Sequence, residues 1–316
     1  MRKYINGNYL VTVGGAFGQD RKYETFRFNE DFNSDFPDSI DLKITNKCSH
    51  GCSYCHESSN SSGKSFNLEN TKQMLDKLPN YPIEVAIGGG NILECFNDLK
   101  ELIKFCNMKS FDTRATLNIK DLENPDDHRI KELIRRLPIG VSINKYSQVE
   151  TIKKHPDFDY YVTPVLHIIV GVFPIEDLKN LLNSEDKFTK KILILGYKQF
   201  GRAKNIKLKD EIIDEWRQVI SEYIYKSRQN KDLYQKSMSK AVAFDNLAID
   251  QLNIRDMLLE TEWRNMYLGR DFSHSMYIDA VEETFAPTSR SDTSERESWK
   301  NTDIINYFKE NHNRWN

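Results

Sequence analysis

Three of the chain's five cysteines lie within eight residues, in the segment KITNKCSHGCSYCHESS at residues 43–59. The spacing C-x3-C-x2-C places Cys48, Cys52 and Cys55 in one loop, and Gly51 lets the backbone turn tightly between the first two. Three thiolates can hold three irons of a [4Fe-4S] cube, which leaves the fourth iron without a protein ligand. An open coordination position distinguishes a reactive metal site from a structural one. The segment therefore predicts an iron–sulfur cluster with one open iron.

Two other uses of these cysteines remain open. A zinc site needs a fourth ligand, for which His50 or His56 is available, but both lie too close in sequence to the cysteines to complete a comfortable tetrahedron. A cluster held by cysteine alone needs a fourth thiol, and only Cys95 and Cys106 remain. We expect these two to be small buried hydrophobic residues, as free cysteines usually are.

The cysteine loop follows the first of six predicted strands that alternate with helices. We expect the strands at residues 40–45, 82–87, 113–119, 139–144, 160–171 and 191–197, and the helices at 67–78, 97–106, 127–137, 147–155 and 174–183. This alternation predicts an α/β fold with a parallel sheet and right-handed crossovers. The pattern by itself does not separate an open sheet from a partial barrel. In both architectures, functional loops gather at the carboxyl ends of the strands.

Two regions flank this alternating core, which we place at residues 39–205. Residues 1–38 are expected to be an extension, with a hairpin about Asn6-Gly7 followed by a linker. The alternation stops after Gly201-Arg202, and residues 206–316 are expected to cap the core and contact substrate. Within this cap we expect a long amphipathic helix, a pair of short strands and a last short helix, at residues 209–227, 275–289 and 303–311.

The cysteine motif resembles that of the radical S-adenosylmethionine (radical SAM) enzymes. The resemblance rests on Cys48-x3-Cys52-x2-Cys55 directly after the first strand, with Tyr54 just before the last cysteine, and it covers about residues 40–201. It implies a partial six-stranded (β/α)6 barrel of the TIM type. It also implies a [4Fe-4S] cluster that binds S-adenosylmethionine (SAM) through its open iron. An external electron donor such as a flavodoxin or ferredoxin would reduce the cluster. SAM would then be cleaved to methionine and a 5′-deoxyadenosyl radical that abstracts hydrogen from a substrate.

The same resemblance implies a binding site for the amino group of SAM after the second strand. Gly88, Gly89 and Gly90 stand where the family has a Gly-Gly-Glu-Pro element. Because Gly90 and Asn91 replace its last two residues, only the backbone part of that contact carries over directly.

Contacts to the adenosine part of SAM are implied at five further positions. Ser142 and Asn144 stand at the end of the fourth strand, where the family often has ribose contacts, and alternation puts both on one face. Tyr54 is expected near the adenine. Gly171 matches part of the family's Gly-x-Ile-x-Gly-x-x-Glu element, although histidine and proline replace its first and last residues. Leu195, on the sixth strand, stands at another adenine-contacting position.

The overall composition indicates which cell compartment and which classes of partner to expect. The chain has 45 basic and 47 acidic residues, so it lacks the basic excess that is usual in nucleic-acid binders. Residues 1–20 do not have the pattern of a secretory signal, and the apolar stretch at 165–173 is too short to span a bilayer. We therefore expect a cytoplasmic protein without membrane contact, in which clustered cysteines act as ligands rather than disulfides.

Three functions remain open. The first is a radical SAM enzyme that acts on a peptide or protein side chain, because the strand pair at residues 275–289 resembles a hairpin of peptide-modifying members, although it lacks their auxiliary-cluster cysteines. The second is a radical SAM enzyme for a nucleotide or small metabolite. The third is a non-enzymatic iron–sulfur or zinc protein. The glycine run at Gly88 argues against the third, because an electron carrier needs no SAM site.

Overall fold

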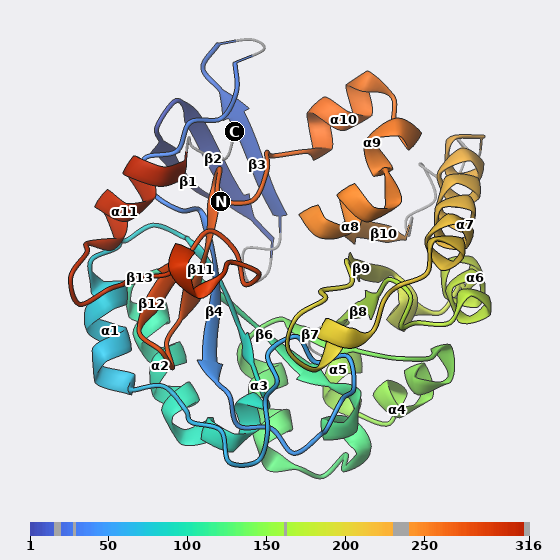
Figure 1. The fold of residues 1–316 in the computed structure, drawn as a ribbon, viewed down its shortest axis with the longest axis horizontal. Coiled ribbons are helices and arrows are strands. Elements are labelled where there is room, and N and C mark those ends of the chain that lie inside the picture. The colour runs from blue at the N-terminus through green and yellow to red at the C-terminus, as the bar shows by residue number, and fades with distance from the viewer. Residues whose placement is uncertain (16–19, 28–29, 161–162, 230–239, 313–316) are drawn as a thin grey trace. The chain divides into compact units, whose positions relative to one another are not determined.

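The computed structural model describes residues 1–15, 20–27, 30–160, 163–229 and 240–312. The chain divides into two compact units. The first comprises Met1–Gly51, Glu57–Ala115 and Leu268–Asn316, and the second comprises Cys52–His56 and Thr116–Tyr267. Both units combine strands with helices (Figure 1).

The first unit begins with a three-stranded antiparallel sheet. Its strands are β1, β2 and β3, at Arg2–Asn6, Tyr9–Gly14 and Asp20–Thr25, in the order β1-β2-β3 (dark blue in Figure 1). The predicted hairpin is present, but Asn6 pairs with Tyr9, so the two turn residues are Gly7 and Asn8 rather than Asn6 and Gly7. Gly7 has φ +58°, a value that glycine adopts readily. The sequence did not predict β3, because its side chains are mostly charged and give no apolar alternation.

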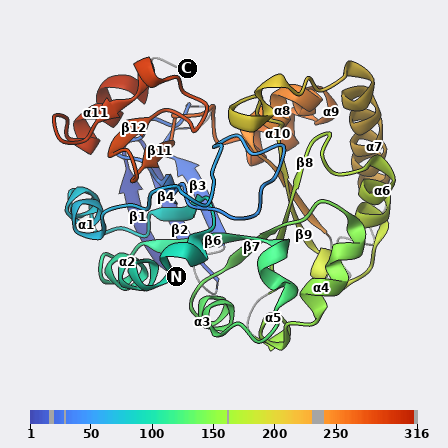
Figure 2. The ribbon, with the colours of Figure 1, turned by 60° about the horizontal axis from the view of Figure 1, so that its bottom comes forward.

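A second sheet of the first unit has the strand order β6-β5-β4-β11-β12-β13. Strands β4, β5, β6 and β11 are parallel, whereas β11, β12 and β13 pair antiparallel with one another. These strands lie at Ser39–Thr45 (β4), Glu84–Gly89 (β5), Asp112–Asn118 (β6, which continues into the second unit), Ser275–Asp279 (β11), Thr284–Ala286 (β12) and Glu297–Ser298 (β13). The helices of this unit are α1 (Leu68–Asp76), α2 (Phe96–Met108) and α11 (Ile304–Asn311), of which α1 and α2 pack side by side (Figure 2).

The predicted strand pair at residues 275–289 is confirmed as β11 and β12, with Ile278 opposite Phe285. However, β11 also pairs in parallel with β4, where Tyr277 is the partner of Asp41. The C-terminal segment therefore extends the sheet that carries the cysteine loop. Sequence pattern could not predict this pairing because it joins two strands that are more than two hundred residues apart.

The second unit is built on parallel strands in the order β10-β9-β8-β7. These strands lie at Ile139–Ser142 (β7), Val165–Ile169 (β8), Lys191–Leu195 (β9) and Ala241–Phe244 (β10). The helices are α3 (His128–Arg136), α4 (Val149–Lys153), α5 (Pro156–Tyr160), α6 (Ile175–Asn183), α7 (Asp210–Gln229), α8 (Asn246–Leu252), α9 (Ile254–Met257) and α10 (Glu260–Met266). Helices α6 and α7 pack against each other (Figures 1 and 2).

The expectation that strand–helix alternation stops after Gly201-Arg202 is wrong. Helix α7 is followed by β10, which pairs in parallel with β9 so that Val242 is the partner of Ile192. Four residues, AVAF, were too short to stand out as a strand. Residues 230–239, between α7 and β10, and residues 161–162, within the predicted fifth strand, lie outside the described part of the chain.

Strands β5, β8 and β9 have alternating burial, which places one set of their apolar side chains in the core. In β5, Val85 and Ile87 are buried while Ala86 and Gly88 are half-buried, and β8 and β9 repeat this alternation. Polar side chains cap the start of some helices, as Asn67 does for α1 by accepting from the Asn70 amide. None of the described helices is both long and apolar enough to cross a membrane.

Candidate functional site

The first part of the cysteine loop is closed at its base within the first unit. The amide of Cys48 donates to the carbonyl of Asn60 at 2.8 Å, and the Asn60 amide donates to Asn46 at 3.1 Å. The Asn46 amide in turn donates to the carbonyl of Lys64 at 2.8 Å. These bonds join the two ends of the loop that follows β4, so the backbone at Cys48 is fixed while its thiol makes none of them.

The glycine run contacts this loop directly. The Gly90 amide donates to the carbonyl of Thr45 at 2.6 Å. A Cβ atom at Gly89, where φ is +120°, would lie 2.5 Å from the Thr45 carbonyl oxygen, and one at Gly90 would lie 2.4 Å from that of Lys47. A Cβ atom at Gly88 would meet nothing within 4 Å. Gly89 and Gly90 therefore serve close backbone packing, and open space remains beside Gly88.

Asn91, which stands in the last position of the Gly-Gly-Glu-Pro alignment, has a capping role. Its side chain accepts from the Leu93 amide at 3.0 Å, and its Nδ2 lies 3.3 Å from Nε2 of His50. The side chain thus starts the short helix at Ile92–Cys95 and contacts the cysteine loop.

A buried charge network holds the end of the loop in the first unit. Nζ of Lys43 lies 2.7 Å from Oε2 of Glu57 and 2.9 Å from Oδ2 of Asp279, and these side chains are 7%, 12% and 1% exposed. Tyr277 donates to the other Glu57 oxygen at 3.2 Å, and Arg296 pairs with Asp279 at 3.2 Å. Burial by itself would lower the pKa of Lys43, but the two carboxylates raise it above its usual value. The network ties the residue two positions after Cys55 to β4 and β11.

The second part of the loop, residues 52–56, belongs to the second unit, where Arg202 holds it. Nε of Arg202 donates to the carbonyl of Cys52 at 2.8 Å, and the Arg202 amide donates to the carbonyl of Cys55 at 3.0 Å. The Cys55 amide also donates to Cys52, at 3.3 Å. These bonds fix the Cys52–Cys55 turn through its backbone. In the sequence, Arg202 marks only the expected end of the core, and its place just after the sixth strand is the signal that points to the loop.

Two of the predicted SAM contacts meet in the second unit. The hydroxyl of Tyr54 donates to Oδ1 of Asn144 at 2.6 Å, and the Asn144 amide donates to Oε1 of Gln148 at 2.7 Å. Burial and then the neighbouring Cys52 raise the pKa of Tyr54, so the phenol remains a donor at neutral pH. The structure therefore links the aromatic residue of the cysteine motif to the end of the fourth predicted strand.

Ser142 and Leu195 stand at strand ends in the same unit. Ser142 is half-buried on β7 and is the partner of His167 on β8. Leu195 is half-buried at the end of β9, and its carbonyl accepts from the Val170 amide at 2.9 Å. Neither residue contacts the Tyr54 hydroxyl in the hydrogen bonds that the structure describes.

The backbone just after β9 is bound by side chains near α8. The Gly196 amide donates to Asp245 and the Tyr197 amide donates to Gln251, both at 2.8 Å. Gln251 also donates to the Tyr197 carbonyl at 3.0 Å. Sequence pattern did not predict these partners, because they come from the region that was expected to be a cap.

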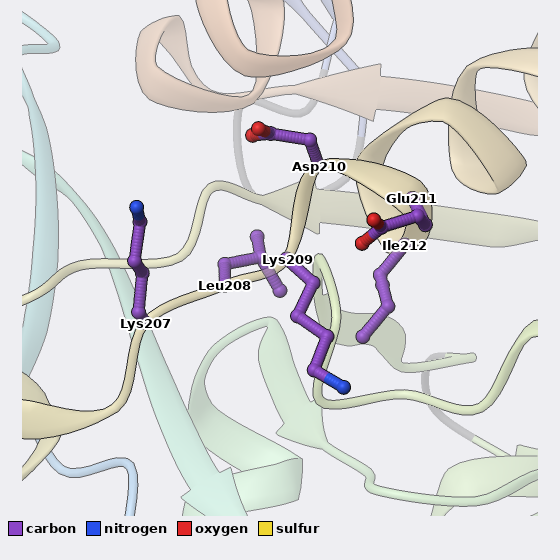
Figure 3. Close-up of a pocket in the computed structure, with 6 residues that line it drawn as sticks. All are labelled: Lys207, Leu208, Lys209, Asp210, Glu211 and Ile212. Atoms are coloured by element: carbon purple, nitrogen blue, oxygen red, sulfur yellow. The ribbon is translucent and has the colours of Figure 1, made fainter.

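Gly171 follows β8 in a left-handed conformation, with φ +73°. A Cβ atom there would lie 2.1 Å from Cδ1 of Leu208, so the turn requires glycine, and the side chain of Leu208 packs against it. Beside this contact is a cavity of about 610 Å³, in which Lys207 and Lys209 point in opposite directions (Figure 3). The cavity is lined by Lys207, Leu208, Lys209, Asp210, Glu211 and Ile212.

The five cysteines fall into two classes. Cys48, Cys52 and Cys55 are half-buried, whereas Cys95 and Cys106 are buried, as predicted, and none of the five forms a disulfide. Burial raises the pKa of both buried thiols to about 12. Across the described ranges, no three His, Cys, Asp or Glu side chains are grouped closely enough to hold a metal ion.

Sequence comparison finds a distant relative. No model of a known protein family matches the chain. An uncharacterised protein of Methanocaldococcus jannaschii is 26% identical over 178 residues, which cover 51% of this chain and 60% of the relative. The chain thus matches less than two thirds of that protein's length.

Comparison with solved structures identifies the fold. Streptococcus suis SuiB bound to S-adenosylmethionine has a TM-score of 0.64 at 14% identity, over 88% of this chain and 67% of SuiB. SuiB bound to its precursor peptide SuiA gives 0.62 at 13% identity, over 88% and 66%. The enzyme anSMEcpe with bound AdoMet and Cp18Cys peptide gives 0.58 at 16% identity, over 87% and 81%. The predicted α/β fold is confirmed by these radical SAM enzymes, while the number of strands in the barrel stays a prediction. The chain therefore has the fold of the radical SAM enzymes.

Proposed function

We propose that the chain is a radical SAM enzyme in which Cys48, Cys52 and Cys55 hold a [4Fe-4S] cluster. The observation that carries this proposal is the way the loop is held. Arg202 binds the carbonyls of Cys52 and Cys55, and the amide of Cys48 is bound by Asn60, so the backbone is fixed without use of a thiol. These bonds fix the backbone at all three cysteines, as a ligand loop requires.

The chemistry of the three donors suits such a cluster. Thiolates are the usual ligands of iron–sulfur clusters. Cys48, Cys52 and Cys55 are half-buried, whereas Cys95 and Cys106 are buried. Gly51, between the first two ligands, has φ +65°, and a Cβ atom there would meet nothing within 4 Å. The turn therefore needs glycine for its backbone conformation and not for space.

A cluster held by these three cysteines would supply the electron for reductive cleavage of SAM to methionine and a 5′-deoxyadenosyl radical, and that radical would abstract hydrogen from the substrate. The chain's own residues bind and orient SAM. Open space beside Gly88 leaves room for the methionine portion. Tyr54 and Asn144 hold each other and present polar atoms to the adenosine, with Ser142, Gly171 and Leu195 at neighbouring strand ends.

We further propose a peptide or protein side chain as the substrate. SuiB binds the precursor peptide SuiA and anSMEcpe binds a Cp18Cys peptide, and both share the fold of this chain. The strands β11 and β12 support the same class, since the corresponding sequence resembles a hairpin of peptide-modifying members.

Production of 5′-deoxyadenosine tests the activity. The protein would be purified without oxygen, reconstituted with iron and sulfide, and supplied with SAM and dithionite. We expect 5′-deoxyadenosine from the wild type and none from Cys52→Ala, which should also hold less iron. Cys106→Ala is the matched control, because the thiol of Cys106 is buried in the core. This variant should keep both its iron and its production of 5′-deoxyadenosine. An intact cluster that yields no 5′-deoxyadenosine, or an active Cys52→Ala, would overturn the proposal.

Deuterium transfer tests the substrate class. Peptide and nucleotide fractions from cells grown in heavy water would be added separately to the active enzyme. Because the radical takes hydrogen from its substrate, we expect deuterium in 5′-deoxyadenosine only with the peptide fraction. Deuterium that arrives only from the nucleotide fraction would show that the peptide assignment is wrong.

A further inference from the structure

A basic segment follows β9 directly. Residues 198–209, KQFGRAKNIKLK, carry five basic side chains and no acidic one, in a chain whose charges are otherwise balanced. The five are Lys198, Arg202, Lys204, Lys207 and Lys209. The charge of this segment is therefore a local feature that the overall composition conceals.

The segment is exposed, and it mixes charge with apolar surface. Lys204, Lys207 and Lys209 are exposed, and they have no acidic partner among the described residues. Between the basic residues stand Phe200 and Ile206, which are 39% and 44% exposed. Exposed lysines around exposed apolar side chains form a surface that favours a protein partner of opposite charge.

This basic segment is bonded to the cysteine loop. Arg202, near its centre, donates from Nε to the carbonyl of Cys52 at 2.8 Å and from its amide to the carbonyl of Cys55 at 3.0 Å. Both partners lie in the second unit. A protein docked on the segment would therefore stand beside two of the three proposed cluster ligands. That position matters for electron delivery, since electron transfer slows steeply with distance.

We propose that residues 198–209 are the docking surface for a small acidic one-electron carrier protein. This inference rests on the proposed function, because it requires a cluster at the cysteine loop. Complementary charge raises the encounter rate of such partners, whose contact areas are typically small. In each event the carrier loses one electron and this protein gains one. An acidic peptide substrate is the competing occupant, and the test must separate the two.

The test variant is Lys204→Glu combined with Lys207→Glu, which reverses two exposed charges and leaves Arg202 in place. The matched control is Lys154→Glu combined with Lys226→Glu, which makes the same charge change in the same unit. Lys154 caps the C-terminus of α4, and Lys226 lies in the last turn of α7. Because crossover helices run back from the carboxyl ends of strands, both control lysines lie near the opposite ends of the strands.

Binding of a bacterial flavodoxin to the reconstituted protein would be measured by calorimetry in about 0.05 M and about 1 M salt. We expect the Lys204→Glu, Lys207→Glu variant to raise the Kd about tenfold at low salt, as losing attractive rim charges does, and the difference to shrink at high salt. The control variant should bind like the wild type. An unchanged Kd in the test variant, or an equal rise in the control, would overturn the docking surface.

Formation of 5′-deoxyadenosine distinguishes a surface that docks the electron carrier from a surface that binds the substrate. With reduced flavodoxin as electron source, the test variant should be slower than the wild type, and with dithionite it should be equal, because a small chemical reductant needs no docking. Loss of the dithionite-driven reaction with iron content unchanged would overturn the proposal in favour of a substrate contact. If even the wild type fails with dithionite, the proposed activity is wrong, and the binding experiment still decides whether an acidic carrier docks here.

Discussion

At the scale of single residues, the candidate site depends on a few polar contacts and on glycines with separate tasks. Tyr54 and Asn144 form a hydrogen bond of 2.6 Å that joins the cysteine motif to the end of a strand. Gly89 and Gly90 let the backbone of the cysteine loop approach, while Gly88 borders open space. Each of these roles can be tested by a small change that leaves the cysteines in place.

Tyr54→Phe removes one hydroxyl and leaves the ring. A hydrogen bond of this kind contributes about 1 kcal/mol, so we expect SAM to bind about fivefold more weakly while the iron content is unchanged. Equilibrium dialysis with labelled SAM measures the change. Tyr146→Phe is the control, because the Tyr146 hydroxyl makes a similar bond with Ser184 in the same unit. If both variants weaken SAM binding alike, Tyr54 has no specific part in it.

Alanine at Gly89 should lower the stability of the fold, whereas alanine at Gly88 should weaken SAM binding. Gly89→Ala places a Cβ atom 2.5 Å from a carbonyl oxygen at φ +120°, so we expect the free energy of unfolding to fall by about 1–3 kcal/mol. Gly88→Ala has room for its methyl group and should keep its stability but weaken SAM binding. Urea unfolding and SAM titration measure the two effects. A stable Gly89→Ala, or a Gly88→Ala that binds SAM normally, would contradict this division of roles.

At the scale of elements, the end of the cysteine loop is fastened to two strands by buried charges. Lys43 comes from β4, Asp279 ends β11, and Glu57 follows the last cysteine by two residues. Since the side chains of Lys43 and Asp279 are 7% and 1% exposed, neither is well solvated if its partner is lost. The network therefore makes β11 part of the support of the loop.

Asp279→Asn should be strongly destabilising. Removing one charge from a buried ionic network typically costs about 3–5 kcal/mol, and here it leaves Lys43 and Arg296 with only Glu57 to balance them. We expect a loss of this order in urea unfolding, with faster loss of iron from the reconstituted protein. Glu24→Gln is the control, because its ion pair with Lys22 is exposed to solvent and should contribute little to stability. A loss for Asp279→Asn no greater than for Glu24→Gln would show that the network is not a support.

At the scale of the whole molecule, the C-terminal residues are part of a folding unit that also holds the N-terminus. Residues 268–316 belong with residues 1–51 and 57–115, and the parallel pairing of β11 with β4 connects them. Apolar side chains from this segment are fully buried, among them Ile278, Phe285 and Phe308. Each buried side chain of this size stabilises the folded state by roughly 1.5–3 kcal/mol.

A chain that ends at residue 267 should therefore fail to fold. We expect it to be insoluble or to lack cooperative thermal unfolding, because β4 loses β11, one of its two neighbouring strands, and the core loses apolar contacts. The chain of residues 1–316 serves as the control and should unfold cooperatively. If the chain of residues 1–267 folds cooperatively and retains iron, the C-terminal segment is a separable cap after all.

The sequence by itself determined the features that depend on neighbouring residues. The cysteine spacing, the six strands from β4 to β9 and the helices between them follow from local order and periodicity, so they could be predicted together with the fold. The burial of Cys95 and Cys106 also followed from residue type. Local signals of this kind can be interpreted from a short segment, without knowledge of the rest of the chain.

Only the tertiary structure decided how distant segments support the loop. Arg202 is bonded to Cys52 across 150 residues, and Lys43 to Asp279 across 236. Strand β10 has four residues and can be recognised as a strand only from its pairing with β9. Such contacts leave no periodic mark in the sequence, because the partners are chosen by the path of the whole chain. The motif therefore indicated the chemistry that we propose, and the tertiary structure showed which distant residues hold the cysteine loop in place.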